Sequence, residues 1–533
     1  MKLKENYLEW SLKHLQKYSH SDFYPKLFEI AAISHNWLEV KKYLLSLDLD
    51  AYQPKSPMIN LAPKPNGNFR IVHQLDPIDS FIYTSLVREV CEVIEQYRIP
   101  ESEKIVCSYR IKPDLEGSFF SNDTGWDTFL SRTQELAKTF EKGFVIIADI
   151  TDFYNQIYTH RINNLIVEAG NGAYDEQAKA IHNFLLSLNV RTSRGIPVGP
   201  APSTILSELV MGSIDKKIFN YTSDFVRYVD DIRIFFDKFE DAIKTLHELT
   251  LYLYTYHRLV FSGEKTKILT VKDFREQYMT DEKKQATTAL LAKADQLTNE
   301  KMQELIDNLP PYSEDFDYGE AYEETLSKIL SEQQFELLSS TYYELFAKAV
   351  STSPRDYALL RHVLRQSRRY RIRSIVPLVL DSFYSIRPVI REAVIYLNAV
   401  INQRTVAENK AKFEELVSFF YMKLPFINLW VSHLLQNECF NNIGLSMKYD
   451  SILSDRGRAL IALRQKDTTW VRSCRDNMNV LGPWDKRAVL YATSLLPLDE
   501  MKPWVETIAA SGDIIDKSIA AFLVSKKKAK KCD

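Results

Sequence analysis

Cysteine is sparse in this chain of 533 residues, and no two cysteines stand at CxxC spacing. The five positions are Cys91, Cys107, Cys439, Cys474 and Cys532. Structural zinc sites and disulfide frameworks both need clustered or regularly spaced cysteines, so we expect neither. A reducing, cytoplasmic environment fits this usage best.

Long hydrophobic runs are also missing. A transmembrane helix needs about 18 or more consecutive apolar residues, and no such stretch occurs, so we expect no membrane span. The opening segment MKLKENYLEWSLKHL alternates charged and apolar residues. It lacks the continuous apolar core of a signal peptide.

Glycine is scarce, with 15 residues, whereas amphipathic leucine-rich segments are common, which favours a mostly helical protein. The length suggests roughly two to four domains. The net charge of −2 lacks the basic footprint with which nucleic-acid enzymes grip long duplexes. Any contact with nucleic acid must therefore come from local patches.

The spacing of apolar residues changes along the chain. Residues 1–50 have apolar positions three and four apart, as helices do. The run INLAPKPNGNFRIV, from Ile59, predicts two short strands around a turn, and residues 141–272 mix strands with helices. Beyond them an acidic stretch, SEDFDYGEAYEE, predicts a surface connection. Short amphipathic helices then follow in pairs typical of a helical repeat, whose period is too degenerate to define.

Two aspartates interrupt a strongly apolar segment. In FVRYVDDIRIFF, residues 225–236, β-branched and aromatic runs flank Asp230 and Asp231, which predicts a hairpin with acids at its turn. A solvated Asp-Asp turn is the ordinary alternative. The apolar flanks instead predict buried strands, where adjacent carboxylates repel one another unless a cation compensates them.

A third carboxylate ends another apolar run. In GFVIIADITDFYNQIYTH, residues 143–160, the strand-like run stops at Asp149 and helical spacing follows. Asp149 alone could cap that helix, but beside the hairpin it becomes a candidate metal ligand. Oxygen ligands without nearby histidine or cysteine select a hard cation such as Mg²⁺. Two such ions roughly 3.5–4 Å apart would activate an attacking hydroxyl and stabilise a leaving pyrophosphate.

Between these elements lies RGIPVGPAPSTILSELVMGSID, residues 194–215. Gly199 and Pro200 belong to a rigid turn, where glycine lets the backbone approach a ligand closely. Ser203 is a candidate cap for the helix that follows. By itself this segment is an ordinary entry from a loop into a helix.

In this order the three elements resemble motifs A, B and C of the reverse-transcriptase palm. The matching residues are Asp-Ile-x-x-Phe-Tyr, then Gly-x-Pro-x-Gly-Pro-x-x-Ser, then Tyr-Val-Asp-Asp. The resemblance implies a nucleotide polymerase that uses two Mg²⁺ ions at Asp149, Asp230 and Asp231. It also implies that Gly199 and Pro200 contact the nucleotide.

Further residues are assigned by the same resemblance. Lys64 and Arg70 match the fingers hairpin, where cations hold the nucleotide triphosphate, and Lys265 matches a proton donor near the leaving phosphate. Each is otherwise a plain surface cation. Tyr154 matches the aromatic residue under the incoming sugar, where a bulky ring excludes a 2′-hydroxyl and favours deoxynucleotides.

The palm match covers residues 55–272, and repeat-like helices follow where a usual polymerase has a compact thumb. With the NxxYxH-like run Asn155–His160, this combination resembles the abortive-infection (Abi) reverse transcriptases of bacterial phage defence. That family implies DNA synthesis without a template, begun on a tyrosine of the protein, with a single-stranded product that stays covalently attached. It also implies a homo-oligomer, and the near-neutral charge agrees with a missing template–primer grip.

The resemblance also suggests which tyrosine primes synthesis. The priming tyrosine of the family lies just upstream of a segment resembling SDFYPKLF, residues 21–28, so the matching position is Tyr18. Packing on a helix face is the ordinary alternative for Tyr18. Tyr7 is the second choice among 29 tyrosines.

An arginine-rich segment, RHVLRQSRRYRIR, spans residues 361–373. Arginines interleaved with Tyr370 could follow a single strand through phosphate contacts and base stacking. The alternative is a solvated helix face that pairs with the acidic connection. The predicted nucleic-acid contacts are Arg361, Arg365, Arg368 and Arg369.

Together these observations predict an α+β fold, with reverse-transcriptase fingers and palm followed by an all-α helical-repeat (HEAT-like) C-terminal domain. The predicted boundaries are an N-terminal helical segment at 1–50, fingers and palm at 51–272, a connection at 273–320 and the repeat domain at 321–525. The predicted function is protein-primed, template-independent polymerisation of deoxynucleoside triphosphates in abortive infection. A template-copying RNA-directed DNA polymerase would need a basic thumb, and a catalytically idle palm scaffold would not need three clustered acids.

Overall fold

The computed structural model describes residues 1–18, 21, 23–65, 67–121, 123–190, 192–279, 290, 291, 294, 330–418, 423–440 and 454–532. The chain forms two compact units that interleave along the sequence. Unit 1 comprises Met1–Asp22, Lys41–Ile59 and Val72–Glu282, and unit 2 comprises Phe23–Val40, Asn60–Ile71 and Lys283–Asp533. The predicted acidic connection SEDFDYGEAYEE lies outside the described residues. Among the helices described, none is long and apolar enough to span a membrane.

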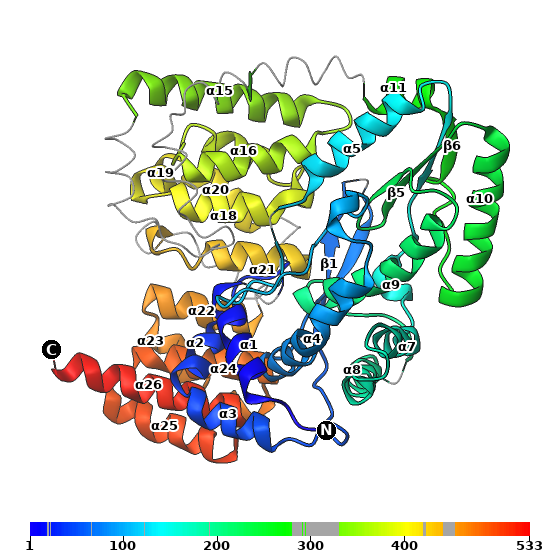
Figure 1. The fold of residues 1–533 in the computed structure, drawn as a ribbon. Coiled ribbons are helices and arrows are strands. Elements are labelled where there is room, and N and C mark those ends of the chain that lie inside the picture. Colours follow the sequence, from blue (N-terminus) through cyan, green and yellow to red (C-terminus); the bar gives the residue numbers. More distant parts are fainter. Residues whose placement is uncertain are drawn as a thin grey trace. The chain divides into compact units, whose positions relative to one another are not determined.

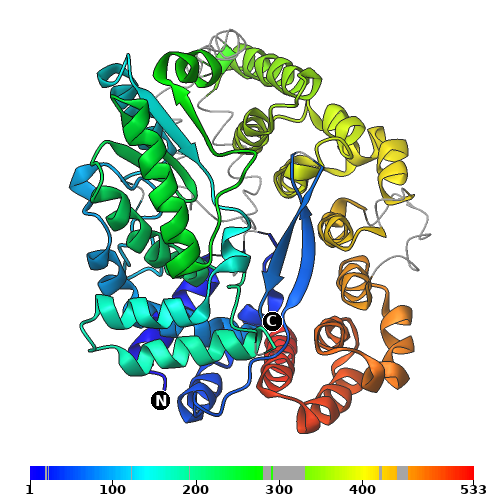
Figure 2. The same cartoon turned by 90° about the vertical axis from the view of Figure 1, so that its right-hand side faces the viewer.

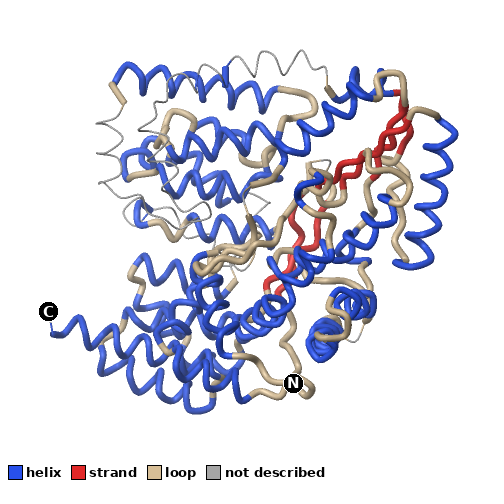
Figure 3. The backbone as a smooth tube through the Cα atoms, in the orientation of Figure 1, coloured by secondary structure: helices blue, strands red, loops and turns tan. Residues whose placement is uncertain are grey.

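Unit 1 contains a four-stranded sheet with the strand order β4-β5-β3-β6, drawn in red in Figure 3. Neighbouring strands are antiparallel, and Ala148 pairs with Ile232 while Tyr228 pairs with Asp231. The apolar runs predicted as strands therefore form the centre of the sheet. The bounds are β3 (Phe144–Ala148), β4 (Phe225–Tyr228), β5 (Asp231–Phe236) and β6 (Lys267–Thr270).

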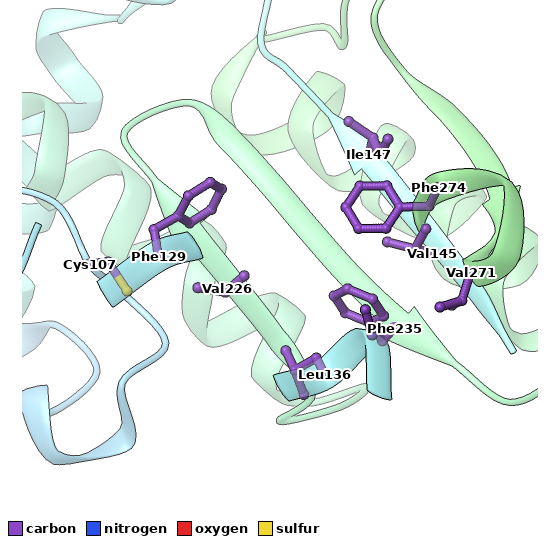
Figure 4. Packing of buried hydrophobic residues seen from close by; sticks show 10 residues of the cluster. Cys107, Phe129, Leu136, Val145, Ile147, Val226, Phe235, Val271 and Phe274 are labelled. Atoms are coloured by element: carbon purple, nitrogen blue, oxygen red, sulfur yellow. The ribbon is translucent and has the colours of Figure 1, made fainter. Parts of the chain in front are cut away.

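Helices cover both faces of this sheet. Figure 4 shows one face, where α5 (Trp126–Thr139) and α11 (Val271–Tyr278) pack on a buried cluster. The cluster contains Cys107, Phe129, Leu136, Ala137, Val145, Ile147, Val226, Phe235, Val271 and Phe274. Side chains alternate along a strand, so the neighbours of these residues point to the opposite face. There α10 (Phe239–Tyr252) packs against β3 and β5, and Arg227 of β4 donates hydrogen bonds to Glu208 and Asp215 of α9 (Ala201–Phe219).

The other helices of unit 1 surround α4 (Pro77–Tyr97), which is buried along most of its length. Pro77 occupies the first turn, and the Asp76 side chain accepts a hydrogen bond from the Ile78 amide at 3.1 Å, so both ordinary start signals are present. Helix α4 packs against α1, α7, α8 and α9. The remaining bounds are α1 (Glu5–Lys17), α6 (Phe153–Gln156), α7 (Thr159–Ala169), α8 (Asp175–Leu188), η1 (Glu101–Glu103) and the π-helical turn η2 (Leu253–His257).

The predicted fingers hairpin forms from β1 (Met58–Pro63) and β2 (Phe69–Gln74), which make a two-stranded sheet. Its tip is closed by a hydrogen bond from the Lys64 amide to the Asn68 carbonyl at 2.7 Å. Gly67 in this turn has φ of +82°, a left-handed conformation that glycine adopts at little cost. The hairpin predicted from the Pro-Asn-Gly turn residues is therefore confirmed.

Unit 2 is helical apart from its share of the hairpin, and its helices stack in succession (Figures 1 and 2). Helix α15 packs on α16, α16 on α18, α18 on α21, α21 on α22, α22 on α24 and α24 on α26. Contacts between nearest neighbours of this kind are typical of helical-repeat proteins. The bounds are α15 (Glu332–Ser351), α16 (Tyr357–Arg369), α17 (Val376–Ser382), α18 (Ile390–Val400), α19 (Gln403–Glu408), α20 (Lys410–Ser418), α21 (Pro425–Leu434), α22 (Asp455–Gln465), α23 (Thr468–Ser473), α24 (Pro483–Ala492), α25 (Leu498–Ser511), α26 (Ile514–Cys532), η3 (Arg387–Val389), η5 (Glu438–Phe440), η6 (Arg475–Val480) and η7 (Thr493–Leu495).

A piece of the N-terminal region belongs to this helical unit. Helix α2 (Phe28–His35) packs against α26, and α3 (Trp37–Ser46) continues the chain into unit 1. The fully buried Glu29 accepts two hydrogen bonds from Arg456, at 2.6 and 2.9 Å. Two charge-assisted bonds to one carboxylate make a strong and geometrically specific contact. The fold is mixed α+β with a helical C-terminal region, as predicted.

Candidate active site

Asp149 and Asp231 meet at one end of the central strands. The antiparallel register pairs Ala148 of β3 with Ile232 of β5, so the next step along the register brings Asp149 opposite Asp231. Asp230 precedes Asp231 in the turn that joins β4 to β5, and all three side chains belong to half-buried residues. The structure therefore brings the three predicted carboxylates to the same edge of the sheet.

The electrostatics of Asp231 agree with this proximity. Burial raises the pKa of Asp231, Arg233 lowers it, and the neighbouring Asp149 raises it again. The Arg233 guanidinium lies 3.5 Å from Asp231 Oδ2. A like charge that influences the pKa in this way must lie close by.

Lys265 lies beside Asp149. Its Nζ atom donates to Asp149 Oδ2 at 2.9 Å, although the side chain is 65% exposed. The turn that carries Lys265 is tied to β3 by a hydrogen bond from the Ser262 amide to the Asp149 carbonyl at 2.8 Å. The Lys265 ammonium thus reaches Asp149 on an exposed side chain that can exchange this partner for another.

The chemistry of the site fits a hard divalent cation, because the candidate ligands are carboxylate oxygens with no nearby thiol or imidazole among them. Within the described part of the chain, no three His, Cys, Asp or Glu side chains converge closely enough to surround an ion. Lys265 and Arg233 instead form ion pairs with Asp149 and Asp231. The residues that would hold the cation are Asp149, Asp230 and Asp231.

The predicted nucleotide-binding loop is held against β2 and the N-terminal segment. Hydrogen bonds join the His73 amide to the Val198 carbonyl at 2.9 Å and the Val198 amide to His73 Nδ1 at 3.1 Å. Gly199 has φ of +129°, and a Cβ atom there would collide with the Ser21 hydroxyl. Only glycine fits this position.

The prediction that Ser203 caps the following helix was wrong. Helix α9 begins earlier, at Ala201 with Pro200 as its N-cap, and Pro202 occupies its first turn, where proline is well tolerated. Ser203 lies one turn further, where its hydroxyl forms a buried hydrogen bond with the Tyr83 hydroxyl at 2.9 Å. Pro200 therefore marks the boundary between the loop and the helix.

Tyr154 lies near the carboxylates at the start of α6. Its hydroxyl accepts a hydrogen bond from Ser207 Oγ of α9 at 3.1 Å, so the ring is fixed at its far end. Burial raises the pKa of Tyr154, and Asp230 is close enough to raise it further. This position is compatible with the predicted contact to the sugar of an incoming nucleotide.

We expect Tyr154→Val to weaken the discrimination between deoxynucleotides and ribonucleotides by about 10- to 100-fold, because a smaller side chain opens space for a 2′-hydroxyl. The measurement is the ratio of kcat/KM for dGTP to that for GTP. Tyr154→Phe is the matched control, since it keeps the ring and loses only the bond to Ser207. A ratio unchanged in Tyr154→Val would mean that the sugar is recognised elsewhere.

Other predicted residues lie in unit 2. Lys64 is half-buried at the hairpin turn, and Arg70 is exposed, with its guanidinium 5.9 Å from the centre of the Phe23 ring. Their contact with a nucleotide stays a prediction.

The predicted arginine contacts lie on and beside α16. Arg361 and Arg365 form ion pairs with the same oxygen of Glu392, at 3.7 and 3.5 Å. Arg368 and Arg369 are half-buried at the end of the helix. The role suggested for Tyr370 was wrong, because this side chain is 4% exposed and packs against Tyr342, so it cannot stack on a base.

The two candidate priming tyrosines lie on α1 and at its C-terminal end. Tyr18 follows the helix directly, is half-buried, and contacts the ring of His14 at a centroid distance of 5.4 Å. Tyr7 lies under the guanidinium of Arg88, 5.7 Å from the ring centre. Ser21, three residues beyond Tyr18, is the residue that abuts Gly199.

Sequence reasoning missed a buried network beside the β4–β5 turn. Arg227, Glu208 and Asp215 are at most 1% exposed, and Arg227 donates hydrogen bonds to both carboxylates. The available signal was one charge in FVRY and two in ILSELVMGSID, both of which are mostly apolar segments. Buried charges of this kind need partners, but spacing alone does not identify them.

Comparison with known families identifies the class of this protein. Residues 62–309, a little under half of the chain, match the family described as Reverse transcriptase (RNA-dependent DNA polymerase). The chain therefore carries a reverse transcriptase domain, a kind of domain that polymerises DNA by nucleotidyl transfer. No curated protein matches the chain.

Solved structures similar to this chain include three telomerases. Apo telomerase from Candida tropicalis, truncated from its C-terminal domain, is 15% identical with a TM-score of 0.31, over 44% of this chain and 54% of that chain. Telomerase from Candida albicans in complex with a TWJ fragment of telomeric RNA is 13% identical with a TM-score of 0.31, over 70% and 64%. Apo telomerase from Candida tropicalis is 12% identical with a TM-score of 0.32, over 79% and 72%. The chain thus spans less than two thirds of the first two, and similarity this low indicates no shared activity.

Proposed function

We propose that this reverse-transcriptase-type polymerase makes DNA without a template, begins synthesis on its own Tyr18 and acts in abortive infection against phage. The substrates are deoxynucleoside triphosphates, and the product is single-stranded DNA that stays covalently attached. The proposal places the protein in the cytoplasm, in agreement with the dispersed cysteines. It also includes assembly into a homo-oligomer. The resemblance to the Abi reverse transcriptases supports the defence role.

One observation carries the priming proposal. The Ser21 hydroxyl lies so close to Gly199 that a side chain at Gly199 would collide with it. Ser21, three residues from Tyr18 in the sequence, is therefore adjacent to the loop proposed to bind the nucleotide. A tyrosine hydroxyl can replace a primer 3′-hydroxyl only if it reaches this loop.

The chemistry is transfer of a nucleotidyl group. The attacking hydroxyl oxygen bonds to the α-phosphorus while the bond to the β-phosphate oxygen breaks, and pyrophosphate leaves with the electron pair. The hydroxyl proton passes to solvent. Divalent cations held by Asp149, Asp230 and Asp231 would lower the pKa of the attacking hydroxyl and neutralise the leaving charge.

Lys265 acts on the leaving group in this scheme. Its ammonium lies 2.9 Å from Asp149 Oδ2 on a largely exposed side chain. When Asp149 binds a cation, the Lys265 side chain is free to move to the departing pyrophosphate. We expect it to donate a proton there.

The priming proposal predicts that Tyr18→Phe abolishes labelling of the protein. Purified wild-type protein, given dNTPs and Mg²⁺ with no primer or template, should gain mass as DNA grows on it. Tyr18→Phe removes the nucleophilic oxygen and keeps the ring, so its contact with His14 should survive. The measurement is intact mass spectrometry together with incorporation of radiolabelled dNTP.

Tyr7→Phe is the matched control, since it removes the same atom from a tyrosine of α1, the helix that Tyr18 follows, and should leave labelling intact. Normal labelling of Tyr18→Phe would exclude Tyr18, and loss of labelling in Tyr7→Phe would identify Tyr7. If the wild-type protein incorporates nothing until a primer–template is added, protein priming is wrong.

The second candidate is template-copying RNA-directed DNA synthesis, which the description of the matching family favours. The net charge of −2 weighs against a long duplex grip. A catalytically idle scaffold is the third candidate. Against it, all three carboxylates are present at one edge of the sheet, where their repulsion would serve no purpose.

A further inference from the structure

The residue that precedes the two hairpin carboxylates has an unusual backbone conformation. Val229 has φ of +55°, in the left-handed region that β-branched residues rarely enter. Such conformations persist only where surrounding structure holds them, and they gather at functional sites. Asp230 and Asp231 follow directly, so the conformation of Val229 sets the course of the chain that carries both.

Two hydrogen bonds hold Val229 in place. Its amide donates to the Ser108 hydroxyl at 3.0 Å, and its carbonyl accepts from Arg227 Nη1 at 2.8 Å. Both backbone polar groups of Val229 are therefore bonded to buried side chains, since Ser108 is 1% and Arg227 0% exposed. These two bonds hold the turn in addition to the pairing of β4 with β5.

Arg227 is itself fully engaged. Its Nε and Nη2 donate to the two oxygens of Asp215, each at 2.7 Å. Its Nη2 and Nη1 donate to the two oxygens of Glu208, at 2.9 and 3.3 Å. With the bond to Val229, all five N–H groups of the guanidinium have acceptors. Arg227 therefore cannot rotate without losing several buried bonds.

Glu208 also fixes Ser108. Its hydroxyl donates to Glu208 Oε1 at 2.9 Å, which orients the lone pair that accepts the Val229 amide. Arg98 donates to Glu208 Oε2 at 2.7 Å, so two arginines balance Glu208 and Asp215. Burial alone would lower the pKa of Arg227, but Asp215 and Glu208 outweigh it and raise that pKa. The group stays charged at any working pH.

We propose that Ser108, Glu208, Asp215 and Arg227 are positioning residues that clamp Val229 in its left-handed conformation and so fix Asp230 and Asp231 for metal binding. All four are at most 1% exposed, so they act through the turn. The inference rests on the carboxylate site proposed above. It assigns a task to buried charges that the chemistry itself does not use.

Ser108→Ala tests the clamp most cleanly, because it removes one acceptor without leaving a charge unpaired. We expect the dissociation constant for Mn²⁺ to rise by about 10- to 100-fold, the usual effect of removing a group that orients metal ligands. The Mg²⁺ concentration for half-maximal nucleotide incorporation should rise in parallel. Ser80→Ala is the matched control, since it also removes a buried serine hydroxyl, which donates to the Asp76 carbonyl at 3.0 Å.

Rescue distinguishes positioning from a general loss of stability. Glycine adopts a positive φ without help, so Ser108→Ala with Val229→Gly should recover Mn²⁺ affinity to within a few-fold of Val229→Gly alone. A structural defect would not be repaired by a second substitution that removes a side chain. Mn²⁺ binding is read by electron paramagnetic resonance, which needs no enzymatic turnover.

Equal Mn²⁺ affinity in Ser108→Ala, Ser80→Ala and wild type would overturn the clamp. If wild-type protein binds no Mn²⁺, the proposed metal site fails, and hydrogen exchange of residues 225–236 then decides about the clamp. Faster exchange there in Ser108→Ala than in Ser80→Ala supports it. Equal exchange overturns it.

Discussion

Asp149→Asn, Asp230→Asn and Asp231→Asn should each abolish nucleotide incorporation while the protein stays folded. An amide replaces a carboxylate of the same shape but binds a divalent cation far more weakly. Loss of one ligand removes several kcal/mol of transition-state stabilisation, and each 1.36 kcal/mol is tenfold in rate. We therefore expect kcat to fall by roughly a thousandfold or more.

Stability should not fall with activity. Burial raises the pKa of Asp231 in the folded protein, so ionising this group at neutral pH costs folding free energy. Its contribution to stability is fully present below the unfolded pKa and is lost as the pH rises through the folded pKa. Asp231→Asn removes that cost, so its melting temperature should equal or exceed that of wild type at pH 7. Asp237→Asn, at the exposed far end of β5, is the matched control for both measurements. Near-normal incorporation with Mg²⁺ in any of the three variants would show that the wrong carboxylates were chosen.

Arg227→Met should destabilise unit 1 more than any surface substitution. The variant leaves Asp215 and Glu208, 0% and 1% exposed, without the cation that bridges them. Breaking a buried ion pair from one side costs about 3–5 kcal/mol, which lowers the melting temperature of a unit of this size by roughly 6–20 °C. Thermal unfolding followed by circular dichroism measures the loss.

Two further variants serve as a control and as a rescue for this measurement. Arg404→Met breaks an exposed pair with Glu408 and should cost at most about 1 kcal/mol. Asp215→Asn in the Arg227→Met background neutralises one stranded carboxylate and should recover part of the lost stability. A melting temperature for Arg227→Met within 2 °C of wild type would show that the network does not stabilise the fold.

The parts of the site predicted from sequence were those with local signals. β3 and the β4–β5 hairpin follow from runs of β-branched and aromatic residues that end at Asp149 and surround Asp230 and Asp231. The hairpin at Lys64 follows from its turn residues. Each of these signals lies within about a dozen residues, the range over which periodicity is informative.

The parts not predicted depend on contacts between distant residues. Arg227 binds Glu208 and Asp215 across 19 and 12 positions, and Arg456 binds Glu29 across 427. Nothing in the spacing of these residues identifies their partners. The Tyr370 prediction failed for the same reason, because an exposed and a buried aromatic residue look alike in sequence until the packing of α15 on α16 is known.

The left-handed conformation of Val229 also could not be predicted from the sequence. Valine is a residue from which a positive φ is not expected, and only Ser108 and Arg227 explain why it occurs. Local preference and the observed backbone disagree at this point, next to the carboxylates. Natural chains tend to break local rules at functional sites, which agrees with the role proposed for the turn.

The central claim is that Asp149, Asp230 and Asp231 hold the divalent cations of a nucleotidyl-transfer site. A crystal structure of the protein with Mn²⁺ and a non-hydrolysable dNTP analogue tests this claim most directly. The account predicts anomalous-scattering peaks bound to these three carboxylates, with Lys265 released from Asp149 and the triphosphate beside them. Peaks at other residues, or a nucleotide bound away from this edge of the sheet, would contradict it.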